Sequence, residues 1–224
     1  LIYPIVLQTG GFNSILAPTV GAEFPMAFRL TTILAKEAFV GFLLGFIIAT
    51  IWHAAEMIGK FVDTARGSAM GQAQVPQMKS SASQIGSVYY QLILVIFLAL
   101  DGHTYFINYF VRSYILIPIA KSPRFDQAWD LFDLVIRITG DLFVAAITLS
   151  APVLIAIFIT DICMALFNKV APQINILFLM MPFKAVLGIA FSMLALTIFV
   201  KQFEGMIAQT FQKLWMAIQF IAPF

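Results

Sequence analysis

Long runs of residues without a single charge constrain this chain more than any other feature of its sequence. One run, Ser80–Leu100, holds 21 residues, and another, Leu142–Thr160, holds 19. A helix needs about 20 apolar residues to cross a bilayer, whereas a strand of a membrane barrel shows a short segment of alternating polarity. Because the runs are continuous, they predict membrane-type helices and no β-sheet.

The composition indicates the same class. Hydrophobic residues make up 61% of the chain and charged residues only 11%, whereas soluble domains carry roughly 25% charged residues. We therefore expect an all-α, polytopic, helical membrane-type protein of long kinked helices and helical hairpins. The net charge of +2 contains no basic block, so binding of nucleic acid has little support.

Residues 1–224 contain no internal repeat, and we expect them to form a single domain. Because Leu1 is not a start methionine, we also expect the N-terminus to be incomplete.

Proline, glycine and charged residues divide the chain into expected helices. The first helix begins after Pro25 and reaches about Lys60 or beyond. Two apolar segments, 80–100 and 104–119, form a hairpin around the turn Asp101-Gly102-His103, in which glycine can supply a positive φ. The last two elements are a bent helix over 125–169 with a kink at Pro152, and a helix over 174–220 interrupted at Pro182-Phe183-Lys184.

Small residues recur at helical spacing in the first expected helix. Gly41, Gly45 and Ala49 form a GxxxG-type stripe, which lets the backbone of another helix approach closely. We expect this face to pack on a neighbouring helix. The same face then becomes polar and charged, through the residues His53, Glu56, Lys60, Asp63 and Gly67.

A polar segment, Gly59–Gly86, interrupts the apolar chain and is rich in Gly, Ser and Gln. It fits an ordinary surface loop, reached by a helix that leaves the membrane for water. It also fits polar backbone held inside an assembly, because such backbone is tolerated at membrane depth only within protein or beside a water-filled cavity. On the second interpretation, the residues expected to lie near a pore or gate are Asp63, Arg66, Gly67, Ser68, Gln72 and Gln74.

The sequence offers little support for catalysis or metal binding. Asp101 and His103 suit a turn better than an acid–base pair, and two histidines with one cysteine make no metal-site pattern. We expect no cofactor, and we expect Cys163 to be an inert packing residue.

An ion- or proton-coupled transporter of small solutes is the alternative function. Ionisable residues inside apolar segments are a functional signal by default. They are Arg112, Asp141, Asp161 and Lys184. No matched pair of broken segments occurs in two halves of the chain, which argues against this class.

Several short patterns occur in order between Lys36 and about Lys201. They are KEAFVGFLLG from Lys36, DTARGSA from Asp63, LALDGH from Leu98, APVL from Ala151, NKVAPQIN from Asn168 and PFK from Pro182. Together they resemble the FliR/SctT family, the export-apparatus subunits of bacterial flagella and type III secretion injectisomes. The DTARGSA segment is closer to the injectisome branch and the Gly102-His103 turn to the flagellar branch. The chain departs from the family pattern at Lys169, where Arg is usual, and at Thr64-Ala65.

The resemblance implies a structural, non-enzymatic subunit of the type III protein export gate. Such a subunit assembles with FliP/SctR-like, FliQ/SctS-like and FlhB/SctU-like subunits into a helical pore for unfolded proteins. It implies a multi-pass location in the bacterial inner membrane, within a flagellar or injectisome basal body and in contact with lipid.

Overall fold

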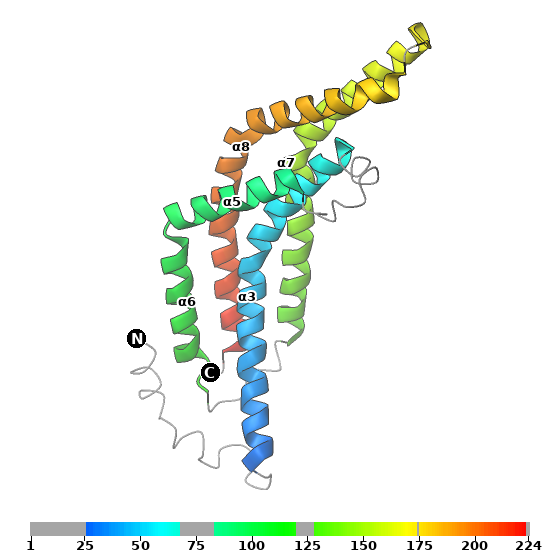
Figure 1. Ribbon diagram of the computed structural model, residues 1–224. Coiled ribbons are helices and arrows are strands. Elements are labelled where there is room, and N and C mark those ends of the chain that lie inside the picture. The colour runs from blue at the N-terminus through cyan, green and yellow to red at the C-terminus, as the bar shows by residue number, and fades with distance from the viewer. Residues whose placement is uncertain (1–25, 68–82, 120–127, 174, 223–224) are drawn as a thin grey trace. The chain divides into compact units, whose positions relative to one another are not determined.

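The computed structural model describes residues 26–67, 83–119, 128–173 and 175–222. Five helices hold nearly all of these residues, and no strand occurs among them (Figure 1). The helices are α3 (Met26–Ala65), α5 (Gln84–Ala99), α6 (Gly102–Leu116), α7 (Ala128–Val170) and α8 (Ile176–Ile221). The predicted all-α class is confirmed.

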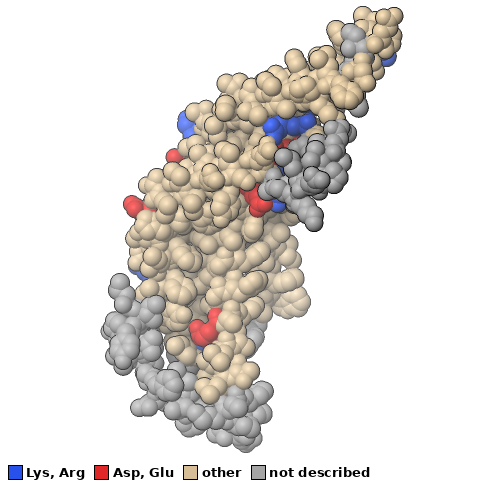
Figure 2. All heavy atoms as spheres, viewed as in Figure 1, with Lys and Arg blue, Asp and Glu red and all other residues tan. Residues whose placement is uncertain are grey.

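Three helical segments are long and apolar enough to cross a membrane: Leu30–Ala65, Ala128–Val170 and Phe178–Ile221. Helices α5 and α6 pass the same test when taken together as one broken span. On the face drawn in Figure 2, acidic and basic side chains form only small, separate patches. These features confirm a membrane-type helical protein.

Helix α3 confirms the expected long first helix, and its end has a clear local cause. Gly67 has a φ of 81°, a left-handed conformation that glycine adopts without steric cost. Its N–H donates to the carbonyl of Thr64 at 3.0 Å. A left-handed glycine just after the last helical turn is a common way to end a helix.

Two details of the predicted elements are wrong. In the turn between α5 and α6, the left-handed residue is Asp101, with a φ of 55°, and not Gly102. Aspartate tolerates this conformation better than most residues. The last helix is also not interrupted at Pro182, because α8 continues through it. Proline removes one hydrogen bond but keeps a helical φ, and a long apolar helix follows.

The chain forms two compact units. Unit 1 draws on Leu1–Thr50, Leu100–Thr139 and Ile207–Phe224, and unit 2 on Ile51–Ala99 and Gly140–Met206. Helices α3, α7 and α8 each contribute residues to both units. The expectation of a single domain stays a prediction.

Each unit has its own apolar core. In unit 1, Ile47, Leu214 and Ile218 are almost completely buried. In unit 2, the Tyr89 ring packs edge-on against Phe199, with centroids 4.9 Å apart. Other fully buried side chains of unit 2 include Ile58, Ile93, Ile157 and Phe203.

Candidate functional site

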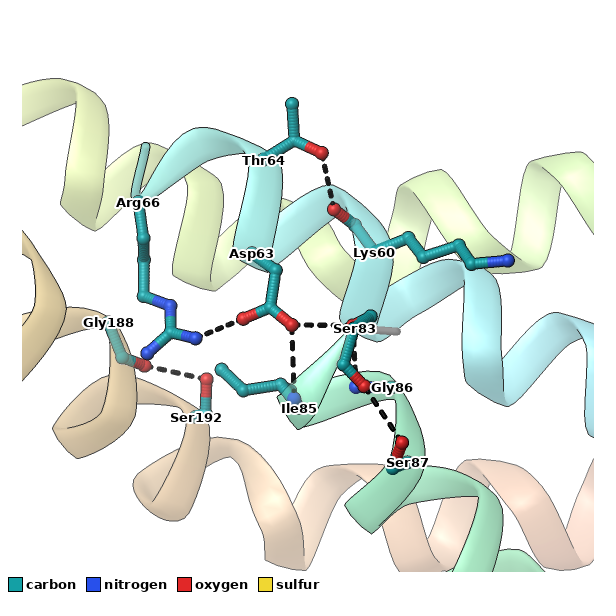
Figure 3. A network of polar contacts seen from close by, with 10 residues as sticks. All are labelled: Lys60, Asp63, Thr64, Arg66, Ser83, Ile85, Gly86, Ser87, Gly188 and Ser192. Atoms are coloured by element: carbon teal, nitrogen blue, oxygen red, sulfur yellow. Dashed lines mark hydrogen bonds and ion pairs between the residues drawn. The ribbon is translucent and has the colours of Figure 1, made fainter. Parts of the chain in front are cut away.

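The polar segment Gly59–Gly86 begins in α3 and ends in α5, and its two described ends contact each other within unit 2. Residues 59–65 are the end of α3, and Arg66 and Gly67 form the turn that follows it; Ser83 directly precedes α5, which begins at Gln84. Figure 3 shows the polar network that joins them. The network is centred on a buried carboxylate, that of Asp63.

Asp63 uses both carboxylate oxygens. Oδ1 forms an ion pair with Nη2 of Arg66, three residues further along and just past the end of α3. Oδ2 accepts hydrogen bonds from the Ser83 hydroxyl at 2.5 Å and from the Ile85 backbone N–H at 3.1 Å. Asp63 is 4% exposed and Arg66 is 8% exposed, so both charges have left water and each depends on its partners.

These contacts also cap the start of α5. The first N–H groups of a helix have no partner within the helix. Ser83 accepts from the Gly86 N–H at 2.8 Å, and Asp63 accepts from the Ile85 N–H. The first turn of α5 has no acidic residue of its own. Asp63 therefore brings a negative charge from α3 to the positive end of the α5 dipole.

Two glycines allow α3 and α5 to approach each other at this point. A methyl group at Gly59 would overlap the backbone N and Cα of Gly86. A methyl group at Gly86 would lie 3.0 Å from the carbonyl oxygen of Glu56. In the sequence, both glycines are only the limits of the polar segment, and this contact was not predicted from them. The available signal was a glycine inside a helical pattern, which often marks close packing.

A third glycine, Gly188 of α8, receives the side chain of Arg66. A methyl group at Gly188 would overlap Cγ and Cδ of Arg66. The Gly188 carbonyl accepts from the Ser192 hydroxyl at 2.6 Å. Arg66 Nε is buried and has no hydrogen-bond partner within the described chain. The network thus connects α3, α5 and α8 inside unit 2 (Figure 3).

The residues of the predicted charged stripe of α3 differ in their exposure to solvent. His53 and Lys60 are exposed, whereas Asp63 is buried. Glu56 and Lys60 form an ion pair, with Nζ 2.7 Å from Oε1, and this pair faces solvent. Three residues predicted to lie near a pore, Ser68, Gln72 and Gln74, lie outside the described residues.

The predicted packing stripe of Gly41, Gly45 and Ala49 has a different environment from Gly59. A methyl group at Gly41 or Gly45 would meet no described atom within 4 Å. Ala49 is half-buried. No described element of this chain therefore packs closely on the two glycines.

A small cavity opens beside Gly41 in unit 1. Its volume of about 20 Å³ has room for about one water molecule, which is too small for a solute. Next to it, Lys36 donates to the carbonyls of Pro118 and Ile119 at 3.1 and 2.9 Å and lies 2.9 Å from Glu37. The residues around the cavity are Glu37, Val40, Gly41, Leu44, Phe110, Ser113, Tyr114 and Ile117.

The ionisable residues that favoured a transporter belong to both units, Arg112 to unit 1 and the others to unit 2. Asp161 of α7 forms an ion pair with Lys184 of α8, and Arg112 is exposed. Among the described residues, no group of His, Cys, Asp and Glu could hold a metal ion. Cys163 is exposed, which corrects the expectation that it packs inside the chain.

Comparisons with known proteins agree on one family. The model of the bacterial export proteins, family 1, matches residues 5–210. Yop proteins translocation protein T of Yersinia pestis is 30% identical over 72% of this chain and 62% of its own length. Secretion system apparatus protein SsaT of Salmonella typhimurium is 30% identical over 67% of this chain and 58% of its length. Flagellar biosynthetic protein FliR of Bacillus subtilis is 27% identical over 71% of this chain and 61% of its length. The chain thus spans about three fifths of these curated relatives.

Asp63→Asn is expected to destabilise the isolated chain in detergent. The substitution keeps the size of the side chain but leaves the buried Arg66 guanidinium without a counter-charge, a loss of about 3–5 kcal/mol for buried ion pairs. Denaturant unfolding measures the change. Glu56→Gln is the control, because it breaks an exposed pair that contributes at most about 1 kcal/mol. Equal effects of the two substitutions would contradict a special role for Asp63.

Gly59→Ala and Gly41→Ala are expected to have opposite effects on the isolated chain. Alanine at Gly59 collides with the backbone of Gly86 and should lower the unfolding temperature. Alanine at Gly41 meets open space and should stabilise α3 by about 0.5–1 kcal/mol, through its higher helix propensity. Thermal unfolding in detergent compares the two. A destabilising Gly41→Ala would show that another part of the chain covers that face.

Proposed function

The chain belongs to the bacterial export proteins of family 1, and we propose that it is a structural, pore-forming subunit of a type III protein export gate. In this role it assembles with FliP/SctR-like and FliQ/SctS-like subunits and contacts an FlhB/SctU-like subunit. The complete gate passes unfolded proteins across the bacterial inner membrane, where this subunit is a multi-pass protein in contact with lipid. The subunit acts by shape and packing, without catalysis or a cofactor.

The names of the relatives support the general role. They describe a translocation protein, a secretion system apparatus protein and a flagellar biosynthetic protein. An apparatus subunit needs surfaces for its neighbours. The most apolar windows of the three candidate spans are only 44%, 28% and 22% buried inside the described chain, which leaves much apolar surface for protein or lipid.

The open Gly41–Gly45 face is the single structural observation that carries the assembly proposal. No described atom would touch a methyl group at either glycine. The exposed side chains of Phe39 and Phe42 lie on the same part of α3. In apolar surroundings, small residues let a second helix come close enough for extensive van der Waals contact. We assign this face to a helix of a neighbouring subunit.

The buried network at Asp63 and Arg66 supports a second part of the proposal. It holds together the two described ends of the polar segment, with Ser83 bonded to Asp63. We propose that the segment beginning at Asp63 lies near the export path. The proposed pore-proximal residues are Asp63, Arg66, Gly67, Ser68, Gln72 and Gln74.

Gly41→Leu and Gly45→Leu are expected to weaken assembly while the isolated chain stays folded. Leucine fills the space that a neighbouring helix would occupy, while its Cβ atom meets no described atom of this chain within 4 Å. The measurement is the stoichiometry of FliP-like and FliQ-like subunits that purify with a tagged copy of the chain. Gly205→Leu is the matched control, because Gly205 of α8 is also open but is not part of the stripe. Full stoichiometry in the Gly41 and Gly45 variants would refute the packing role.

Ser68→Cys and Gln74→Cys are expected to cross-link to an export substrate stalled in the gate. The exposed Cys163 is first replaced by Ser to remove background reaction. Thr104→Cys is the control for exposure alone, since Thr104 is an exposed residue of unit 1. If Ser68→Cys and Gln74→Cys in a closed complex react only with reagents from bulk solvent, and not with substrate, the segment is an ordinary surface loop.

A further inference from the structure

The last turns of α7 and the first turns of α8 form a hairpin tip, defined here as residues 161–170 and 176–184. Helix α7 ends at Val170 and α8 begins at Ile176. The hairpin tip lies within unit 2, and Figure 1 shows the two helices meeting at its end. The hairpin tip contains the ion pair of Asp161 and Lys184, which the proposed function does not use.

The hairpin tip has no apolar core of its own. None of the side chains described between Phe158 and Leu187 is buried. Val170 is 83% exposed and Phe178 is 74% exposed. Interdigitated buried side chains normally specify how two helices align. The apolar side chains of the hairpin tip point outward instead: Ile162, Leu166, Phe167, Val170, Phe178, Leu179 and Phe183.

One polar contact crosses between the two helices here. Lys184 Nζ of α8 pairs with Asp161 Oδ1 of α7. The side chain of Lys184 is 15% exposed and that of Asp161 is 35% exposed, while Oδ1 itself is enclosed. The charges of the pair are therefore better shielded than those of the surface pair Asp133–Arg137, whose side chains are 58% and 73% exposed.

We infer that the Asp161–Lys184 pair sets the alignment of α7 and α8 in the hairpin tip. A shift of one helix by a single turn moves its side chains about 5.4 Å along the axis, which is enough to separate the two charged groups. Each charge would then lie alone among apolar side chains, an unfavourable arrangement in apolar surroundings. An outward-facing apolar surface contributes no comparable preference for one alignment.

The same pair allows charges to occur in an apolar hairpin. A paired Asp and Lys carry no net charge together, and the enclosed oxygen faces its own counter-charge. The hairpin tip can therefore enter lipid or a protein partner as one element that is already aligned. This inference depends on the contact between Asp161 and Lys184 and is independent of the proposed export role.

Hydrogen exchange of the full-length chain in detergent tests the inference. Asp161→Asn and Lys184→Met should each raise exchange at the amides of residues 162–183 about tenfold, through easier local opening. The charge-swapped double variant, Asp161→Lys with Lys184→Asp, should restore slow exchange. Asp161→Glu should retain most of the protection, because it keeps the charge.

Two comparisons make the test decisive. Asp133→Asn breaks an exposed ion pair within unit 1 and should leave exchange at residues 162–183 unchanged. The amides of α5 report whether unit 2 as a whole stays folded. Slow exchange in Asp161→Asn with an intact α5 would overturn the inference. Fast exchange in the charge-swapped variant with an intact α5 would also overturn it, because opposite charges would then be insufficient.

Discussion

The contact on which unit 2 depends most is the buried ion pair of Asp63 and Arg66. Asp63 lies in the last turn of α3 and Arg66 directly follows that helix, yet their side chains contact other helices. Asp63 caps the first turn of α5, and Arg66 lies against Gly188 of α8. Removing one member of a buried pair leaves the other charge without compensation. The pair therefore makes the end of α3, the start of α5 and one turn of α8 depend on each other.

The lengths and ends of the helices were largely predictable from the sequence. Charge-free runs, prolines and glycines act locally, so the beginning of α3 and the extent of α7 follow from the residues themselves. Two predictions from local rules were wrong, at positions where both the predicted and the observed conformation are sterically allowed. Gly102 suited a left-handed turn, but Asp101 adopts it. Pro182 suited an interruption, but α8 accepts the loss of one hydrogen bond.

The candidate site was predictable only in part. Asp63 and Arg66 were predicted as site residues because charges are rare in this chain and because the segment that contains them resembles the family pattern. Ser83 and Gly188 gave no such signal, since each matters only through a residue distant in sequence. Gly41 and Gly59 show the same limit. A glycine pattern indicates that close approach is sterically possible, but it does not say which glycine meets another helix of the same chain.

The surroundings of the glycines also determine how freely each can change in evolution. At Gly59 the obstacle to a larger residue is the backbone of Gly86, and every amino acid carries that backbone. No substitution at position 86 can therefore make room for a larger residue at position 59. Gly59 cannot be replaced while α3 and α5 cross at this point. At Gly188 the obstacle is the flexible side chain of Arg66. A shorter residue at position 66 would leave room for a larger residue at position 188. Positions 66 and 188 can therefore change together in relatives whose network uses other residues.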